Sequence, residues 1–346
     1  MRVAVIGCGA IGTWHARIVA EHAAGTLAAV CDTDGDKARS LAESLGTRAF
    51  VDAGHMLAET PLDALIVATT EDSHVALAAL AAQHGCGVLI EKPVAADLDG
   101  IAAIERAAAA HGITVMAAHV ERFETGYAHL RDAVAQGVCG RVVSVAARRR
   151  FGPAQAPRFA GRSTTLRLLA VHDFDLIAWV HPATPTEVYA VAGRGAIHAA
   201  CGMDDCVSVT VRFADGAVGR VDSAWTLPPA YERFAAPQGW APSGDNLLEV
   251  VGDRGVIAND VSLRNQQLTL YDTGHGFRAD DTRHQPVLHG RVVGALRDEV
   301  DHFLACVRDG SRPLVGLADA RRSIALVQAA ERSLAEARPV PVDGWA

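Results

Sequence analysis

Three glycines near the start of the chain have the spacing of a phosphate-binding loop. Gly7, Gly9 and Gly12 follow the apolar run RVAVI and open an amphipathic segment, with Ala10 and Ile11 between them. In such a loop the first glycine permits a tight turn, the second lets the backbone approach a pyrophosphate, and the third lets the helix pack closely on the strand. Because a helix N-terminus also attracts anions, residues 7–12 are predicted to bind a dinucleotide.

An acidic residue follows this loop at the distance that the dinucleotide interpretation requires. Asp32 lies 20 positions beyond Gly12 and directly follows the second apolar run, TLAAVC. A carboxylate at this place accepts hydrogen bonds from ribose hydroxyls and repels a 2′-phosphate, so NAD is expected rather than NADP. The alternative is an ordinary glycine-rich turn followed by a surface aspartate. Cys8, inside the loop, is expected to contribute only its backbone.

A lysine follows the fifth apolar run, where a buried strand is expected to end. In GVLIEKP, Glu91 and Lys92 come directly after Ile90, and Pro93 stiffens the chain beyond them. Ligands of open α/β sheets bind at the carboxyl ends of the strands, so Lys92 is expected beside the nicotinamide. The alternative is a surface lysine whose stem lies along apolar neighbours. At this edge the residues predicted to contact the cofactor are Thr69, Thr70, His74, Glu91 and Lys92.

The first 120 residues alternate between two kinds of segment, which would position these groups. Ala-rich amphipathic segments such as DKARSLAESLG end in glycine, as helices often do. Between them lie apolar runs typical of β-strands: RVAVIG, TLAAVCD, RAFVD, DALIVATT, GVLIEK and TVMAAH. Fully apolar strands that alternate with helices predict a parallel sheet covered on both faces. Residues 1–120 are therefore expected to form a doubly wound, Rossmann-type α/β domain.

Residues 121–346 follow a different pattern, typical of an α+β domain with a mostly antiparallel open sheet. Helices are expected over about 124–136, 164–180, 291–309 and 317–336, and the last two are expected to pack back on the first domain. Strands are expected over 141–150, 187–193, 206–213, 217–225, 246–252 and 266–272, with ADG as a hairpin turn after Phe213. The predicted role of this domain is to bind substrate and to form oligomers.

Composition excludes several classes of function. The net charge is −8 and the pI is near 6.0, which argues against nucleic acid and anionic membranes as partners. No apolar run is long enough to span a bilayer. The seven cysteines are scattered and form no CxxC pair, so free thiols in a reducing cytoplasm are expected. The 15 histidines show no HxxxH or HExxH spacing, and no metal site is expected.

Four segments together resemble the glucose–fructose oxidoreductase/inositol dehydrogenase family, Gfo/Idh/MocA. They are GCGAIG, ATTEDSH, EKPVA and AVHDFDLIAWV, and the resemblance extends over nearly the whole chain. In that family the EKP lysine contacts the reacting oxygen, which gives Lys92 this role by resemblance. His172 matches the histidine that acts as general acid or base, and Asp175 matches an acid that contacts substrate. An imidazole suits proton transfer because its pKa lies near working pH.

The chain departs from the family pattern one helical turn before His172. The family usually has aspartate there, where it orients the imidazole and stabilises its charged form; this chain has Leu168. Three consequences remain open. The reaction runs on Lys92 and His172 with a slower or shifted pH profile, another residue supplies the orienting group, or catalysis has been lost. The first two are the preferred interpretation.

Substrate residues are suggested by weaker similarities. VERFETGY resembles a segment that lines the substrate site of inositol dehydrogenases, which makes Arg122 and Tyr127 candidates; Tyr231 is another. Packing between the domains explains them equally well. Seven arginines between 141 and 167 could hold a phosphate or a nucleotide-sugar pyrophosphate, although a solvated arginine-rich face is the simpler explanation.

These observations predict an NAD-dependent oxidoreductase that transfers hydride between nicotinamide and a secondary alcohol or ketone of a sugar, cyclitol or nucleotide sugar. By resemblance, a homodimer or homotetramer is expected, formed through the open face of the second sheet. The alternative from another class is a cofactor-binding regulator, since the family includes a transcriptional regulator without catalysis. A two-domain dehydrogenase of amino-acid biosynthesis is disfavoured, because no nucleophilic cysteine or alternative lysine motif is evident in the second domain.

Overall fold

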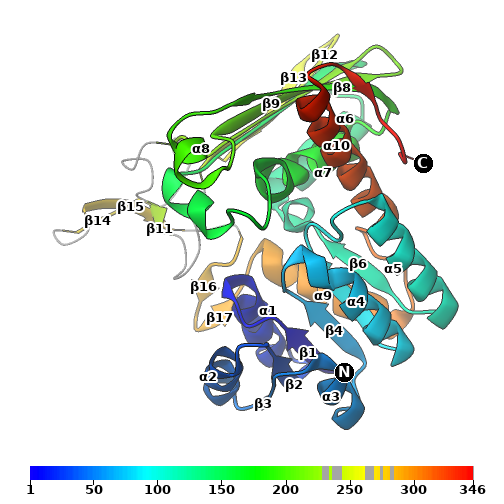
Figure 1. Cartoon of the computed structure of the whole chain (residues 1–346), viewed down its shortest axis with the longest axis vertical. Coiled ribbons are helices and arrows are strands. Elements are labelled where there is room, and N and C mark those ends of the chain that lie inside the picture. The colour runs from blue at the N-terminus through cyan, green and yellow to red at the C-terminus, as the bar shows by residue number, and fades with distance from the viewer. Residues whose placement is uncertain (228–233, 236–243, 262–268, 273–275, 281–283, 346) are drawn as a thin grey trace. The chain divides into compact units, whose positions relative to one another are not determined.

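The computed structural model of the chain describes residues 1–227, 234–235, 244–261, 269–272, 276–280 and 284–345 (Figure 1). The chain forms two compact units, each described below by itself. Unit 1 comprises residues 1–123 and 284–320, and unit 2 comprises residues 124–283 and 321–346. The chain therefore passes between the units after residues 123, 283 and 320.

Unit 1 is built on a six-stranded parallel sheet with the order β3-β2-β1-β4-β5-β6. The strands are β1 (Arg2–Ile6), β2 (Thr26–Cys31), β3 (Arg48–Phe50), β4 (Ala64–Val67), β5 (Gly87–Glu91) and β6 (Val115–Ala118). Every residue of β4, β5 and β6 is buried, because helices cover both faces of the sheet. The prediction of a doubly wound parallel sheet is confirmed.

Helices α1, α2 and α9 lie on one face of this sheet, and α4 and α5 pack together on the other (Figure 1). The helices are α1 (Ala10–Ala20), α2 (Gly35–Leu45), α3 (Ala53–Glu59), α4 (Glu71–Gln83), α5 (Leu98–His111) and α9 (Ala295–Asp309), with a 3₁₀ turn η1 (Val120–Phe123) after β6. The expected helix at 291–309 begins later, because β17 (Arg291–Val292) pairs with β16 (Val287–Leu288). Phe303 and Leu304 of α9 join the same apolar core as strands β1 and β5.

Unit 2 contains a seven-stranded sheet in which β7 and β10 are parallel and all other neighbours antiparallel. In spatial order its strands are β13 (Val256–Asp260), β12 (Asp245–Gly252), β7 (Val142–Arg150), β10 (Val218–Ala224), β9 (Cys206–Phe213), β8 (Pro185–Gly193) and β18 (Val340–Pro341). Buried and exposed residues alternate along β9, which is typical of a sheet covered on one face. The mostly antiparallel open sheet is confirmed. A smaller sheet joins β11 (Phe234–Ala235), β15 (Gly276–Asp280) and β14 (Thr269–Asp272).

Helices cover one face of this sheet. They are α6 (Thr125–Ala135), α7 (Val171–Val180) and the part of α10 (Leu317–Glu336) that belongs to unit 2, and their shared core includes Tyr127, Phe174 and Leu326. A short helix, α8 (Ala196–Cys201), was not predicted. The segment after β7, for which no helix or strand was predicted, contains a 3₁₀ helix, η2 (Pro153–Arg158). A π-helical turn, η3 (Leu166–Ala170), precedes α7.

Within the part of the chain that the structure describes, no helix has both the length and the apolar character needed to cross a bilayer.

Candidate active site

The glycine loop joins β1 to α1 at the carboxyl edge of the sheet in unit 1. Gly7 has φ +98°, and a Cβ there would lie 2.3 Å from the carbonyl oxygen of Ala68. A Cβ on Gly12 would lie 1.8 Å from the carbonyl oxygen of Gly7, so both positions require glycine. A Cβ on Gly9, by contrast, would meet nothing within 4 Å. The loop therefore leaves open space at the N-terminus of α1, as a bound pyrophosphate requires.

Asp32 lies directly after β2 and is held against this loop. Its Oδ2 accepts the backbone N–H of Cys8 at 2.7 Å, and its Oδ1 accepts that of Asp34 at 2.8 Å. These contacts fix the carboxylate beside the loop, where ribose hydroxyls of a dinucleotide would lie. Burial, reinforced by the charge of Asp32, raises the pKa of the Cys8 thiol to about 12. Cys8 is therefore a poor nucleophile, in agreement with a purely backbone role.

The turn after β4 is fastened to the EKP segment by His74. Thr70 precedes α4 as its N-cap, and the hydroxyls of Thr69 and Ser73 are 2.6 Å apart. His74 is 1% exposed, with Nδ1 3.0 Å from the carbonyl oxygen of Pro93 and Nε2 3.2 Å from that of Thr69. Burial lowers the pKa of His74 despite these two acceptors, so the neutral ring donates to one of them. His74 thus ties two loops of the same edge together.

Glu91 is the last residue of β5 and is tied down on the other side. Its Oε1 lies 2.9 Å from Nε2 of the buried His15, and its Oε2 accepts the backbone N–H of Lys92 at 3.1 Å. Burial alone would raise the pKa of Glu91, but the hydrogen bond from His15 and the positive charge of Lys92 keep it below its usual value. The Lys92–Pro93 peptide bond is cis. Buried histidines therefore hold the residues on both sides of Lys92.

Arg122 and Tyr127, the substrate candidates from the resemblance, lie in different units. Arg122 is a buried residue of η1, and its guanidinium lies 3.2 Å from Oδ1 of Asp319 within unit 1. Tyr127 is buried in the core of unit 2. Tyr231 lies outside the described residues.

The catalytic helix of the family pattern is α7 in unit 2. His172 is half-buried on its first turn, and Asp175, three positions later, is 1% exposed. Asp173 lies between them in sequence, but its Oδ1 accepts a hydrogen bond from Nε of Arg149 at 3.1 Å. The structure therefore describes His172 and Asp175 on one helix of unit 2, and Lys92 on the sheet edge of unit 1.

Leu168 lies in the middle of the π-helical turn that precedes α7. It packs against a small apolar cluster around Leu169, Met203 and Trp225, and the indole N–H of Trp225 donates to Thr165 at 3.0 Å. Leu168 therefore has an apolar packing role that an aspartate could not fill. A π-helical turn is rare and frequently accompanies functional sites, because the extra residue changes which side chains share a helix face.

Four of the seven arginines of this cluster pair with carboxylates of their own unit. Arg148 and Arg150 contact the two oxygens of Asp245, and Arg167 binds Glu331 through two hydrogen bonds of 2.8 and 2.9 Å. Arg149 points to the opposite face of the sheet, toward Asp173, as the period-2 alternation predicts. These pairings favour the structural interpretation of the cluster over a phosphate site.

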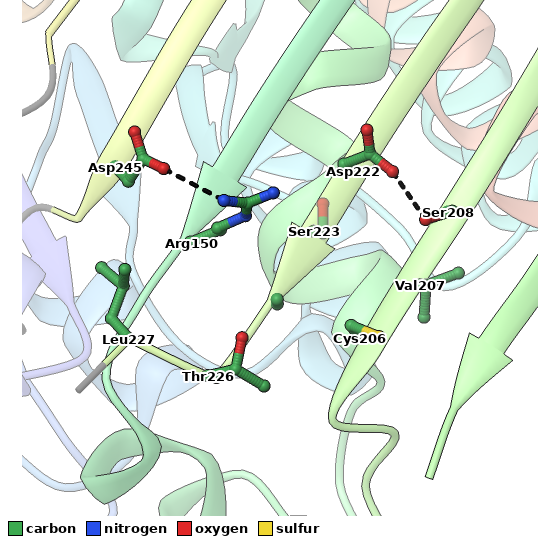
Figure 2. Close-up of a pocket in the computed structure, with 10 residues that line it drawn as sticks. Arg150, Cys206, Val207, Ser208, Asp222, Ser223, Thr226, Leu227 and Asp245 are labelled. Atoms are coloured by element: carbon green, nitrogen blue, oxygen red, sulfur yellow. Dashed lines mark hydrogen bonds and ion pairs between the residues drawn. The ribbon is translucent and has the colours of Figure 1, made fainter.

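A cavity of about 450 Å³ lies beside Arg150 at the ends of β7, β9 and β10 (Figure 2). Asp245 pairs with Arg150 on one side, and Asp222 accepts the hydroxyl of Ser208 at 2.6 Å on the other (Figure 2). Arg150, one of the seven arginines considered for a phosphate site, lines this cavity; among the described residues, none of the predicted catalytic, substrate-binding or cofactor-binding residues does. In the described ranges, no group of three or more histidine, cysteine or acidic side chains could hold a metal ion.

Two buried residues that act on Glu91, the neighbour of Lys92, were not recognised from the sequence. His15 lies in α1, three positions after Gly12. Its fixed spacing from the glycine loop could have marked it as a neighbour of the site. Glu299, in the middle of α9, had no such signal, because it is far from every motif in the sequence.

Comparison with known proteins gives matches over the whole chain. Residues 1–119 match the model described as "Oxidoreductase family, NAD-binding Rossmann fold", and residues 127–258 match the GFO/IDH/MocA C-terminal domain. An inositol 2-dehydrogenase from Acidothermus cellulolyticus is 30% identical over 75% of this chain and 72% of its own. A scyllo-inositol 2-dehydrogenase (NAD(+)) from Bacillus subtilis is 26% identical over 99% of this chain and 96% of its own. The structure of a scyllo-inositol dehydrogenase from Lactobacillus casei with bound NAD(H) and scyllo-inositol shares the fold, with a TM-score of 0.83, 16% identity and 99% coverage of both chains.

Proposed function

Because this chain belongs to the Gfo/Idh/MocA family of oxidoreductases, we propose that Lys92 and His172 carry out its hydride-transfer reaction. Membership makes the chain an NAD-dependent dehydrogenase that acts on CH–OH groups of a sugar or cyclitol. The observation that carries the role of Lys92 is its place in unit 1. It follows β5 at the sheet edge that also bears the glycine loop, and buried histidines hold its neighbours Glu91 and Pro93.

Lys92 and His172 divide the work on the reacting alcohol. Bound NAD supplies the hydride acceptor at C4 of its nicotinamide ring. The ammonium of Lys92 donates a hydrogen bond to the reacting oxygen and stabilises the negative charge that develops there. His172 takes the hydroxyl proton and returns it in the reverse direction. Asp175, on the same helix, binds a second hydroxyl of the substrate and so fixes its orientation.

The cofactor contacts proposed for unit 1 follow from the fit of its sheet edge. Gly9 leaves space for the pyrophosphate, and Asp32 is already oriented by two backbone N–H groups. A fixed carboxylate at the ribose disfavours the 2′-phosphate of NADP. Ala10 and Ile11 complete the loop, and Thr69, Thr70 and His74 complete the edge.

A cyclitol is the first substrate class to consider. The relatives described above are named as inositol dehydrogenases, and a polyol needs hydrogen-bonding groups rather than a dense positive site. A nucleotide sugar is less favoured, because Arg148, Arg149 and Arg150 already pair with Asp245 and Asp173. Free sugars remain the second class.

The reaction proceeds without an acid at position 168. Leu168 packs in an apolar cluster, and the neighbouring Arg167 is engaged by Glu331. The imidazole of His172 therefore lacks the family's usual orienting acid from that position, and we expect a slower or pH-shifted proton transfer rather than a silent site.

We further propose a homodimer or homotetramer formed through the open face of the seven-stranded sheet. That face exposes apolar side chains, among them Tyr189, Val191 and Val218. Exposed apolar patches of this kind favour association.

A reducing, cytoplasmic location is proposed because all seven cysteines are free thiols.

The test is turnover measured by NADH absorbance against a panel of cyclitols, free sugars and UDP-sugars, in both directions. Lys92→Ala should lower kcat by about 10²–10⁴-fold while retaining NAD affinity. The chain has one other lysine, Lys37, and Lys37→Ala is the matched control that should leave kcat unchanged. Tight NAD binding without turnover on any substrate would contradict the proposal and favour the regulator alternative.

A further inference from the structure

Glu299 is a buried carboxyl group whose surroundings disfavour the ionised form. It lies in the middle of α9 and is 0% exposed. Neither Oε1 nor Oε2 has a hydrogen-bond partner among the described residues. Because an ionised carboxylate without partners is far more costly to bury than a neutral acid, the protonated form is favoured.

Glu91 is buried as well, but its surroundings favour the opposite state. It accepts hydrogen bonds from His15 and from the backbone of Lys92, and both stabilise the negative charge. That charge acts on Glu299: burial and the nearby Glu91 together raise the pKa of Glu299 well above its usual value. The hydrogen bonds of Glu91 and the unpartnered burial of Glu299 therefore favour opposite protonation states in the two carboxyls.

Several other charged groups on the elements packed around Glu299 are engaged by partners of their own. On α9 itself, Arg297 contacts Glu21 and Asp301. On η1, Glu121 lies 3.2 Å from His284 and Arg122 lies 3.2 Å from Asp319. On α1, His15 binds Glu91. None of these pairs supplies a hydrogen bond to Glu299, which leaves Glu91 as the group whose charge it senses.

We propose that Glu91 and Glu299 form a buried carboxyl pair that carries one proton and one negative charge, with the proton on Glu299, and that the ionised Glu91 is a positioning residue for Lys92. The inference rests on the proposed role of Lys92. Glu91, ionised and fixed by His15, holds the Lys92 backbone and favours the ammonium form that polarises the substrate oxygen. Because Glu299 keeps its proton, the pair carries one negative charge, and no second buried charge disturbs the contact between Glu91 and Lys92.

The carboxyl pair predicts a pH dependence of kcat in the variants that a purely structural role would not produce. Glu299→Gln mimics the neutral acid and should leave kcat within about threefold of the wild type. Glu91→Gln should lower kcat by about 10–100-fold at neutral pH, and activity should recover as the pH rises, because Glu299 has lost its charged neighbour and can ionise. The double variant has no carboxylate, so its activity should stay low at every pH. A purely structural role would give pH-independent, additive losses.

Two readouts do not require turnover and separate this inference from the proposed function. Infrared spectra at pH 8 should contain the carbonyl stretching band of a protonated carboxyl, lost in Glu299→Gln and kept in Glu43→Gln, a matched change of an exposed glutamate on α2. Pulse acylation with mass spectrometry should give Lys92 the same titration midpoint in Glu299→Gln as in the wild type, and a lower midpoint in Glu91→Gln. Lys37, paired with Asp34, is the internal standard in each sample.

Absence of the infrared band in the wild type, or an unchanged Lys92 midpoint in Glu91→Gln, overturns the carboxyl pair even if the chain is a dehydrogenase. Should Glu299→Gln fail to fold, the wild-type band at pH 8 and the Glu91→Gln midpoint still decide. If no substrate turns over, the proposed function fails, and these two readouts still test the pair.

Discussion

Nε of Arg149 lies 3.1 Å from Oδ1 of Asp173, and the two residues are 3% and 2% exposed. The pair links the sheet of unit 2, through β7, to α7, the helix that carries His172. This buried ion pair therefore joins the sheet to the helix on which His172 is proposed to act.

Removing one partner of this pair breaks a buried ion pair and leaves the charge of the other residue without this contact. Asp173→Leu is expected to lower the free energy of unfolding by about 3–5 kcal/mol, and the double variant Arg149→Met/Asp173→Leu by considerably less. Urea unfolding measures both. Arg131→Met, which removes an exposed contact to Asp132, is the matched control with an expected change of about 0–1 kcal/mol. Equal losses in the single and double variants would contradict this account.

Asp32 should set the cofactor preference. Asp32→Ala removes a carboxylate that two backbone N–H groups orient, and NADH should bind about 10–100-fold more weakly, by analogy with the loss of a charged hydrogen bond. NADPH should be affected less, because the repulsion of its 2′-phosphate is also removed. Fluorescence titration gives both Kd values. Asp34→Ala, the loss of the N-cap of α2, is the control, and it should leave the NADH/NADPH ratio unchanged.

Cys8 should resist alkylation in the native protein although it lies in the cofactor loop. Burial raises the pKa of Cys8 to about 12 and that of Cys31 to about 11, so the thiolate is scarce at pH 8. With iodoacetamide and peptide mass spectrometry, Cys201 and Cys206, which are partly exposed, should react first. Labelling of Cys8 as fast as Cys201 would show that the loop opens readily.

Glu299 should make stability decline as the pH rises. Its pKa in the folded chain is raised by burial and by Glu91, so unfolding above about pH 4.5 releases its proton. Its contribution is complete below the unfolded pKa and is lost as the pH rises toward the folded pKa, at up to about 1.4 kcal/mol per pH unit. Urea unfolding between pH 5 and 8 should show this slope in wild type and in Glu43→Gln. A slope that persists in Glu299→Gln would assign the proton elsewhere.

Leu168 should matter more for stability than for catalysis. Leu168→Ala removes a half-buried side chain from the cluster around Trp225, and the free energy of unfolding should fall by about 1–3 kcal/mol. Because the wild type already lacks an acid there, kcat should stay within about threefold. Leu168→Met, similar in volume, is the control for both measurements. A large fall in kcat without a change in stability would mean that Leu168 orients His172 by contact.

The local signals in unit 1 were sufficient to predict its fold. Apolar runs such as Val88–Ile90 are buried on both faces, and the glycine spacing fixes the turn into α1, so period and motif agree. The π-helical turn before His172 could not be predicted, because it inserts a residue into a pattern whose apolar positions otherwise fit an α-helix. The burial of His15, Glu91 and Glu299 depends on segments far apart in sequence, for which no single-sequence pattern exists.

The three crossings of the chain between its units have a consequence for how this protein can be divided. A fragment that ends at residue 123 would contain all six strands of the parallel sheet but not α9. The side chains of Leu296, Val300 and Phe303 would be missing from its core, and the sheet face that they cover would meet water. Such a fragment should be prone to aggregation, because the nucleotide-binding unit is built from two separate stretches of the chain. Any exchange of this unit between relatives must carry residues 284–320 along with it.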